Sequence, residues 1–366
     1  LNGLYRVFYE SPKMCAQFNV QALTDRREGG QINPLEGVPG LFGIRQNNDR
    51  VEVWGKVGYE GIGGKPYNQL GNMVSASWHR TSSLFGPNTY TAEQQSFYWQ
   101  SLYQTIIGTT DHKIVAAPSF QYDDIRESVN DGKLDRREAV PGAMLEYTYS
   151  RPNLSMEMPD LVVVLGARAD WNSRFDRLLF TPRLSAKYNF SQSSIVRVSA
   201  GRGFRSPNLM AENISLLASN RTLHFAYDLG LEEAWNYGLN FTQNFKIARR
   251  ESSFSIDLYR TDFVQQILVD VDQSPTQVFF YHAAGPSFSN SVLATLQYNL
   301  LKGLDLKLAY KWNDARATFS DGVLRTLPLV ARHRGLITLD YTTPDKNWMF
   351  NTRVQIVGPQ RLPDNS

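Results

Sequence analysis

The sequence predicts an all-β protein, a transmembrane antiparallel β-barrel. The clearest evidence is the segment 303–313, because its side chains alternate between apolar and polar or small types. Its apolar positions are Leu304, Leu306, Leu308, Tyr310 and Trp312. Successive side chains of a strand point to opposite faces, so this segment has one face for lipid and one for water. The same alternation recurs at 161–171, 180–190, 235–246, 291–300 and 347–356, as in barrels that cross a membrane around a wet interior.

Aromatic residues provide the second observation. They make up 12% of the chain, and many fall near the ends of the alternating segments. Membrane barrels collect aromatic side chains where lipid meets water. The residues that fit such interfacial girdles are Tyr188, Tyr310, Trp312, Tyr341 and Trp348.

Taken in chain order, the pattern predicts about sixteen strands whose lengths suit tilted membrane strands. We expect them near residues 2–9, 13–24, 49–59, 70–80, 93–107, 112–122, 138–149, 159–171, 178–190, 194–204, 234–246, 252–266, 278–300, 303–314, 330–342 and 347–357. Helical periodicity is expected only around 209–218.

The connections between these strands alternate in length, which is the third observation. Short connections are expected at 11–13, 108–111, 191–193, 248–250, 302–303 and 344–346, and long ones at 25–48, 81–92, 123–137, 205–233 and 315–329. Four others fit less well, since 172–177 and 267–277 are short for loops and 60–69 and 150–158 are long for turns. Outer-membrane barrels place short turns in the periplasm and long loops outside. The long loops are therefore expected on one extracellular face, where binding concentrates.

Composition excludes several classes of protein. The mean hydropathy is −0.37, and no apolar run approaches the roughly 18 residues of a membrane helix. The net charge is +3 with Lys and Arg dispersed, which argues against a nucleic-acid partner. The single cysteine, Cys15, is interpreted as a small strand residue rather than a catalytic thiol. No linker or low-complexity stretch divides the chain into domains.

Several segments together resemble a known family. Gly-Arg-Gly-Phe-Arg at 201–205 leads into Ala-Glu-Asn at 211–213, and Ala-Trp-Asn-Tyr-Gly follows at 234–238. Further matching segments lie at 258–263, 271–275, 328–333 and 358–363. Together they resemble the barrel of TonB-dependent outer-membrane receptors, especially the Bacteroidetes branch related to cobalamin and siderophore receptors.

The resemblance implies a barrel of about 22 strands with a plugged lumen. Residues 1–366 are then expected to be a partial barrel domain that lacks the N-terminal plug and the first and last strands. It also implies energy-coupled uptake, in which the plug is coupled to TonB–ExbB–ExbD and the inner-membrane proton gradient. The implied ligand is a corrinoid, a ferric siderophore or another metal chelate, and no cofactor is implied. The implied location is the bacterial outer membrane, in contact with its lipid and lipopolysaccharide.

The loop from Arg202 to Glu233 is the leading recognition element, because its side chains can hydrogen-bond a polar ligand and stack on it. The candidate ligand-binding residues are Arg205, Asn208, Glu212, Asn213, Arg221, His224, Tyr227 and Asp228. The alternative roles for any of them are structure of the barrel rim and contact with lipopolysaccharide.

Charges on the polar faces predict a hydrated lumen that faces the plug, with substrate guidance as an alternative role. A Lys or Arg facing lipid near the midplane costs about 2–4 kcal/mol, which favours the inward assignment. The set is Arg168, Asp170, Arg183, Lys187, Arg197, Asp305, Lys307 and Arg353.

Metal and catalytic motifs are incomplete. Residues 127–138 have the spacing of a calcium loop, but Val129 stands where an oxygen ligand is needed, so a hairpin tip is expected there instead. The five histidines lack zinc spacing, although chelation of haem or metal by two loop histidines stays open. Residues 58–68 contain Gly64-Lys65 without the rest of a phosphate loop and are expected to form a turn. No Gly-x-Ser-x-Gly elbow is present, and we predict a protein that is not an enzyme.

Two other functional classes stay open. One is a passive porin or adhesin-like barrel without energy coupling, which would lack an upstream plug and TonB-contact segment. The other is a soluble all-β binding protein, which would have few aromatic residues at its strand ends and no regular alternation of connection lengths.

Overall fold

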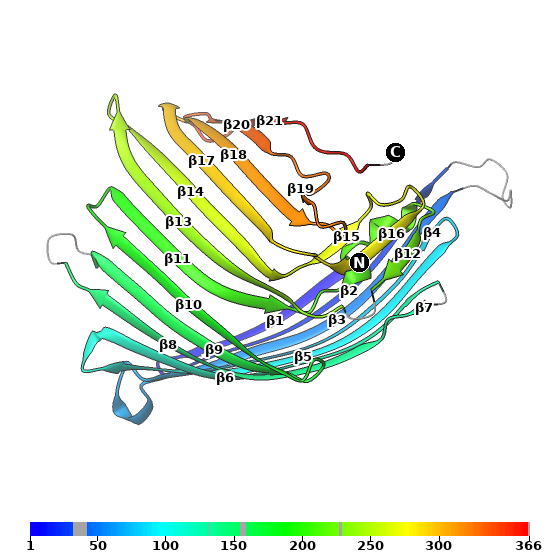
Figure 1. Ribbon diagram of the computed structural model, residues 1–366. Coiled ribbons are helices and arrows are strands. Elements are labelled where there is room, and N and C mark those ends of the chain that lie inside the picture. The colour runs from blue at the N-terminus through cyan, green and yellow to red at the C-terminus, as the bar shows by residue number, and fades with distance from the viewer. Residues whose placement is uncertain (32–41, 131, 154–158, 227–228, 365–366) are drawn as a thin grey trace. The chain divides into compact units, whose positions relative to one another are not determined.

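The computed structural model describes residues 1–31, 42–130, 132–153, 159–226 and 229–364, and strands dominate it (Figure 1). Within these ranges, sixteen strands have nine or more residues, in agreement with the number predicted. They are β1 (Asn2–Ser11), β2 (Met14–Gly30), β3 (Gly43–Glu60), β4 (Gln69–Phe85), β5 (Asn88–Ile107), β6 (Thr109–Val129), β8 (Arg136–Arg151), β9 (Leu161–Asn172), β10 (Arg177–Asn189), β11 (Ser194–Arg205), β13 (Glu232–Ile247), β14 (Arg250–Gln265), β17 (Ser287–Leu301), β18 (Leu304–Thr318), β20 (His333–Thr342) and β21 (Met349–Val357).

The shorter elements lie in the connections. They are the strands β7 (Gly132–Lys133), β12 (Thr222–Phe225), β15 (Ile267–Asp270), β16 (Gln277–His282) and β19 (Leu324–Thr326), the helix α1 (Leu209–Glu212), and the 3₁₀ turns η1 (Ile62–Gly64) and η2 (Ile214–Ala218). Helical structure at 209–218 is as predicted, and 58–68 contains a turn rather than a phosphate loop.

The chain forms two compact units. Unit 1 comprises Leu1–Tyr147, Gly166–Phe180 and Pro207–Arg221, and unit 2 comprises Thr148–Leu165, Thr181–Ser206 and Thr222–Ser366. The strands β8, β9 and β10 each contribute residues to both units.

In unit 1, consecutive strands pair antiparallel from β1 to β6. These strands, blue to cyan in Figure 1, are long, and β5 and β6 reach 20 and 21 residues. A membrane strand needs only about 9–11 residues. The strands therefore continue well beyond the length that lipid requires.

In unit 2, β10 pairs with β11, and antiparallel pairing continues through β13, β14, β17, β18, β20 and β21. A separate small sheet forms from the connections, with β12 parallel and β15 antiparallel to β16 (Figure 1). The loops that follow β11 and β14 are thus joined by backbone hydrogen bonds.

In unit 2, the pairing register of the strands confirms that each strand has one apolar and one polar face. Val198, Leu239, Leu258, Val292 and Trp312 lie opposite one another on five neighbouring strands. Four of these five side chains are aliphatic. Val198 and Leu239 are nevertheless each 43% exposed. An exposed apolar row of this kind is what lipid, rather than water, stabilises.

In unit 1 the apolar face ends at a definite level. Val51 and Trp78 lie opposite each other on this face, while two residues further along the strands Asp49, Arg80 and Glu93 occupy it. The indole Nε1 of Trp78 donates to Glu93 Oε1 at 3.2 Å. The side chains thus change from apolar to charged at Trp78, which we take as the boundary of the apolar band.

The turn between β17 and β18 depends on a glycine with a left-handed backbone. Gly303, between β17 and β18, has φ +81°, and a Cβ there would lie 2.2 Å from the carbonyl oxygen of Thr342. Only glycine adopts this conformation without strain.

Two predicted long loops are wrong. At 81–92, β4 continues to Phe85 and β5 begins at Asn88, with a turn at Gly86, whose φ is +57°. At 123–137, β6 continues to Val129 and pairs with β7 in a hairpin. Above the apolar band neither face needs to be apolar, so the alternation that revealed the other strands is missing here.

The prediction of one continuous strand over 278–300 is wrong as well. This segment is divided into β16 and β17, which belong to different sheets. Pro286 stands immediately before β17, and proline lacks the N–H that a continuous ladder would need. The connection 267–277, expected to be a plain loop, contains β15.

Within the described residues, no helix has the length and apolar character needed to cross a membrane.

A charge on the apolar face should destabilise the protein. We expect Val198→Arg to lower the free energy of unfolding by about 2–4 kcal/mol, as for a lipid-facing Arg near the midplane. Ser199→Arg is the matched control, since the neighbouring side chain points to the polar face. The measurement is a urea titration of the protein folded into lipid vesicles, and equal losses for the two variants would contradict the assignment of faces.

Candidate ligand-binding site

Two of the predicted polar-face charges form an ion pair in unit 1, in which the carboxylate is buried and the arginine is partly exposed. On β9, Arg168 Nε donates to Asp170 Oδ2 at 2.6 Å, and Arg168 Nη2 donates to Ser119 Oγ at 2.7 Å. Asp170 is only 1% exposed, so its carboxylate needs these partners. Gly142 leaves the necessary space, because a Cβ there would lie 1.8 Å from Asp170 Oδ1.

The other six predicted charges lie on the polar face of unit 2. Lys187 is directly opposite Arg197, and like charges in this position repel each other. Arg197 Nη1 donates to Asn240 Oδ1 at 2.9 Å, and Asn240 Nδ2 donates to Asp257 Oδ1 at 2.7 Å. The side chain of Asn240 thus links Arg197 to the carboxylate of Asp257. Asn240 and Asp257 were not singled out from the sequence, although both lie on the polar side of predicted strands.

The remaining members of the predicted set occupy the same polar face. Arg183 lies opposite Gly201 and Arg353 opposite Thr338. Both arginines are exposed.

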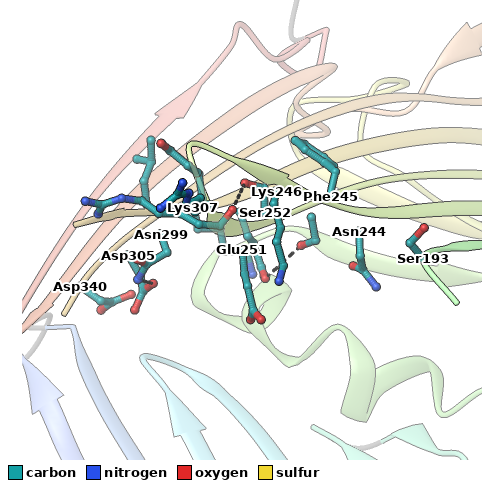
Figure 2. Close-up of a pocket in the computed structure, with 16 residues that line it drawn as sticks. Ser193, Asn244, Phe245, Lys246, Glu251, Ser252, Asn299, Asp305, Lys307 and Asp340 are labelled. Atoms are coloured by element: carbon teal, nitrogen blue, oxygen red, sulfur yellow. Dashed lines mark hydrogen bonds between the residues drawn. The ribbon is translucent and has the colours of Figure 1, made fainter. Parts of the chain in front are cut away.

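Asp305 and Lys307 line a cavity of about 1,130 Å³ at the short-turn ends of the strands in unit 2 (Figure 2). Sequence reasoning missed Lys246, Glu251 and Asp340, which line it as well. Asn299 Nδ2 donates to Asp305 Oδ1 at 2.8 Å. No ion pair joins the charged side chains of this cavity in the part of the chain that the structure describes. The cavity therefore presents unpaired charges of both signs.

Three of the predicted loop residues hold the segment 207–221 of unit 1 together. The backbone N–H of Asn208 donates to Glu212 Oε1 at 2.9 Å, and Asn213 Nδ2 donates to the Leu209 carbonyl at 2.8 Å. Met210 and Leu217 are buried beneath. The segment is thus an ordered cap, and Arg221 lies at its end.

The predicted residues of unit 2 have local partners. Arg205 Nε donates to Glu232 Oε2 at 2.6 Å, and the ring of His224 stacks on Phe279 with centroids 5.1 Å apart. The structure adds Arg202, whose Nη2 donates to Glu233 Oε2 at 2.5 Å. Sequence reasoning did not propose this pair, although both residues lie in segments that carry the family resemblance. Tyr227 and Asp228 lie outside the described residues.

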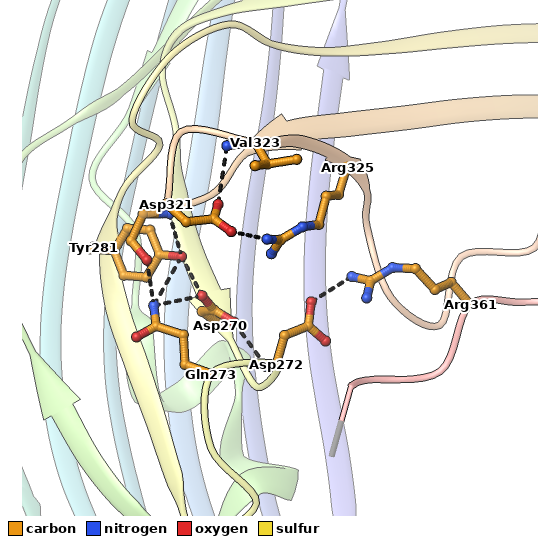
Figure 3. Close-up of polar contacts among 9 residues, drawn as sticks. Asp270, Asp272, Gln273, Tyr281, Asp321, Val323, Arg325 and Arg361 are labelled. Atoms are coloured by element: carbon orange, nitrogen blue, oxygen red, sulfur yellow. Dashed lines mark hydrogen bonds and ion pairs between the residues drawn. The ribbon is translucent and has the colours of Figure 1, made fainter. Parts of the chain in front are cut away.

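A polar cluster joins two connections of unit 2, the one between β14 and β17 and the one between β18 and β20 (Figure 3). Asp270, 1% exposed, accepts hydrogen bonds from the hydroxyl of Tyr281, from Gln273 Nε2 at 2.8 Å and from the backbone N–H of Asp272 at 2.9 Å. Gln273 Nε2 also donates to Ser320 Oγ at 2.7 Å. Burial, together with Asp270, raises the pKa of Tyr281 above its usual value. Tyr281 is therefore a hydrogen-bond donor at neutral pH.

The same cluster binds the segment after β21. Arg361 Nη2 donates to Asp272 Oδ2 at 2.7 Å, and the Leu329 N–H donates to the Arg361 carbonyl at 2.8 Å. The guanidinium of Arg361 also lies 5.8 Å from the ring of Phe319, which is 2% exposed. Segments 271–275, 328–333 and 358–363, which were recognised separately in the sequence, therefore meet in space.

The described residues contain no group of three or more His, Cys, Asp and Glu side chains arranged to hold a metal ion. Glu127, at the start of the calcium-like segment, accepts the Tyr90 hydroxyl at 2.8 Å. Its carboxylate thus has a protein partner.

These features define a class: a membrane protein built from antiparallel strands, whose units each have an apolar face, a polar face that carries charge, and ordered connections. Comparison with solved structures agrees. The chain superimposes on the alcaligin outer-membrane receptor FauA from Bordetella pertussis with a TM-score of 0.65 at 12% identity, covering 98% of this chain and 60% of that one.

Two further structures have the same fold. The siderophore receptor PirA from Pseudomonas aeruginosa gives a TM-score of 0.67 at 12% identity, over 98% of this chain and 62% of its own. The outer-membrane transporter YddB from Escherichia coli gives 0.70 at 9% identity, over 99% and 57%. The chain thus spans about 60% of the length of these proteins. A search of curated protein sequences found no match.

Comparison of the amino-acid sequence with protein families assigns the family. Residues 17–366 match the family described as TonB dependent receptor-like, beta-barrel, and the chain belongs to this family. This confirms the predicted fold class and the location in the bacterial outer membrane. The solved structures similar to this chain are receptors and transporters. The relation to the Bacteroidetes branch stays a prediction.

The space that Gly142 leaves for Asp170 can be tested. We expect Gly142→Ala to lower the free energy of unfolding by about 1–3 kcal/mol, because the added methyl group must displace a buried, ion-paired carboxylate. Gly71→Ala is the control, since nothing lies within 4 Å of a Cβ there. Urea titration in lipid vesicles measures both, and an unchanged midpoint for Gly142→Ala would show that Asp170 moves freely.

Proposed function

We propose that the protein is an outer-membrane receptor for energy-coupled, TonB-dependent uptake of a scarce nutrient. The observation that carries the proposal is the family match over residues 17–366. The ion pairs Arg202–Glu233 and Asp272–Arg361 support it, because they join segments whose sequences resemble that family. We also propose that residues 1–366 are part of the barrel domain of a longer receptor with an N-terminal plug, which agrees with their coverage of about 60% of the solved receptors.

The proposed ligand is a metal chelate or a corrinoid. The similar structures include receptors named for alcaligin, for siderophores and for a haem-carrying hemophore. These names support a chelate, and the resemblance to cobalamin receptors keeps a corrinoid in the proposal. The residues proposed to contact it are Asn208, Glu212, Asn213 and Arg221 of unit 1 and Arg205 and His224 of unit 2, together with Tyr227, which the sequence alone proposes.

The proposed partner of the polar face is the receptor's own plug and, through it, TonB–ExbB–ExbD. Lys246, Lys307 and Glu251 line the cavity of Figure 2 without ion-pair partners among the described residues. Unpaired charges on a half-enclosed surface gain most from a partner of opposite charge. The predicted charges are likewise proposed to face a hydrated lumen: in unit 1 Arg168 and Asp170, and in unit 2 Arg183, Lys187, Arg197, Asp305, Lys307 and Arg353.

Lipopolysaccharide is the proposed partner of the outer face above the apolar band. In unit 1 this level carries Asp49, Arg80 and Glu93, and in unit 2 the pair Arg260–Asp262 at 2.6 Å. Mixed charges beside an apolar band match a lipid with phosphate and sugar groups above its acyl chains.

Uptake measurements test the proposal. The complete receptor is expressed in a bacterial strain without its own receptors for ferric siderophores and corrinoids, with TonB either present or deleted. We expect radiolabelled uptake of one ligand from a panel of ferric siderophores and cyanocobalamin only where TonB is present, because the plug opens only when coupled to it. Equal entry in both strains would contradict the proposal and favour a passive barrel.

A further inference from the structure

A second cavity, of about 190 Å³, lies on the polar face of unit 1 beneath the segment 207–221. Four long strands, β3 to β6, form its floor. It lies beyond Trp78, above the apolar band. Of the residues proposed above to contact the ligand, Asn208 lines this cavity.

The residues that pair across the four strands explain why this cavity exists. Asn48, Thr81, Ala92 and Glu127 lie directly opposite one another on the four strands. In this row the methyl group of Ala92 is the smallest side chain, and it is flanked by Thr81 and Glu127. His79, Gln94 and Ile125 form the next row toward the membrane. The cavity is therefore the space that a larger residue at position 92 would fill.

The roof of the cavity is held in place. Asn208, Ala211 and Ile214 close it from above. Arg136 Nη1 donates to the Pro207 carbonyl at 2.5 Å, and Asn88 Nδ2 donates to the Leu217 carbonyl at 3.0 Å, so both ends of the segment are tied to strands of unit 1.

The cavity is lined by one anionic group. Glu127 is 6% exposed, and its Oε1 accepts the Tyr90 hydroxyl. Burial raises the pKa of Glu127 above its usual value, while the Tyr90 hydroxyl and Arg136 act in the opposite direction. The positive charge of Arg136 stabilises this carboxylate electrostatically, but Arg136 does not line the cavity. A cation inside the cavity would stabilise the carboxylate.

The other groups are compatible with a cation. Burial, together with the nearby Arg50, lowers the pKa of His79, so its ring is neutral at pH 7 and can accept a hydrogen bond. The side-chain Oδ1 of Asn208 is buried and has no hydrogen-bond partner. Gln94 Nε2 is already engaged by Ser96 and Asp123. Acceptors thus surround the space at several points.

Size and polarity restrict the occupant further. The volume equals that of about six water molecules at ~30 Å³ each. The side chains of Ala92, Ile125, Ala211 and Ile214 make part of the lining apolar. An ammonium group has three donors and no acceptor, and a short alkyl chain would contact the apolar part.

We propose that this cavity binds a primary alkylammonium group. The inference extends the proposed function, because such a group would belong to the imported ligand. It names a chemical feature of that ligand: an amine on an aliphatic arm that enters between the strands and the 207–221 cap.

Binding of small probes to the purified complete receptor tests this inference without any transport. Calorimetric titration with n-butylammonium should show binding. 1-Butanol, which has the same four-carbon chain without the charge, and pentanoate, which has this chain with a negative charge, should bind at least about tenfold more weakly. Equal binding of 1-butanol would overturn the inference, and so would no binding of n-butylammonium.

Two variants locate the site. Ala92→Leu fills the cavity and should abolish binding of n-butylammonium. Glu127→Gln keeps the shape but removes the charge and should weaken binding about tenfold. Ala76→Leu, on the apolar face of β4, is the control that should bind like the wild type. Wild-type affinity in both test variants would overturn the proposed site.

The Glu127→Gln variant keeps the test valid if Ala92→Leu does not fold. The outcome is also separable from that of the uptake experiment. Loss of TonB-dependent uptake with intact amine binding would refute the transport function alone, and the reverse result would refute the cavity alone.

Discussion

The structure depends on one constraint: within lipid, every backbone N–H and C=O group must find its partner inside the protein. Antiparallel pairing between consecutive strands satisfies it, and the side chains are then divided between two faces by the pleat. In unit 2 this places Val198, Leu239 and Leu258 side by side on the apolar face. The opposite face is free to carry charge, and the Arg197–Asn240–Asp257 chain of hydrogen bonds uses that freedom.

The same constraint explains what could be predicted from the sequence. Where lipid demands an apolar face, alternation marks each strand, and the number of long strands was predicted correctly. Above the apolar band this demand ends, so β4, β5 and β6 continue through 81–92 and 123–137 in segments that look like loops. Polar strand extensions and true loops have similar compositions, and only the pairing of Asn48 with Thr81 and of Thr81 with Ala92 distinguishes them.

The candidate site was predictable only in part, and for a related reason. The loop residues Asn208, Glu212 and Asn213 were identified as a group, and they do lie together, although their hydrogen bonds serve the cap itself. Contacts between segments that are far apart in the chain could not be predicted from the sequence. Arg361 and Asp272 are 89 residues apart in the chain, and nothing local in either segment indicates the other. The extensions of β4, β5 and β6, which were not predicted from the sequence, also form the floor of the 190 Å³ cavity.

The most direct test of the account is a labelling scan along β18. Single cysteines at 306–311, in a Cys15→Ala background, would carry spin labels whose collisions with oxygen, enriched in lipid, and with a water-soluble nickel complex are measured in vesicles. For a barrel strand we expect a period of two, with positions 306, 308 and 310 open to oxygen and positions 307, 309 and 311 open to nickel. Uniform accessibility, or the opposite phase, would contradict a barrel strand with Leu306, Leu308 and Tyr310 facing lipid.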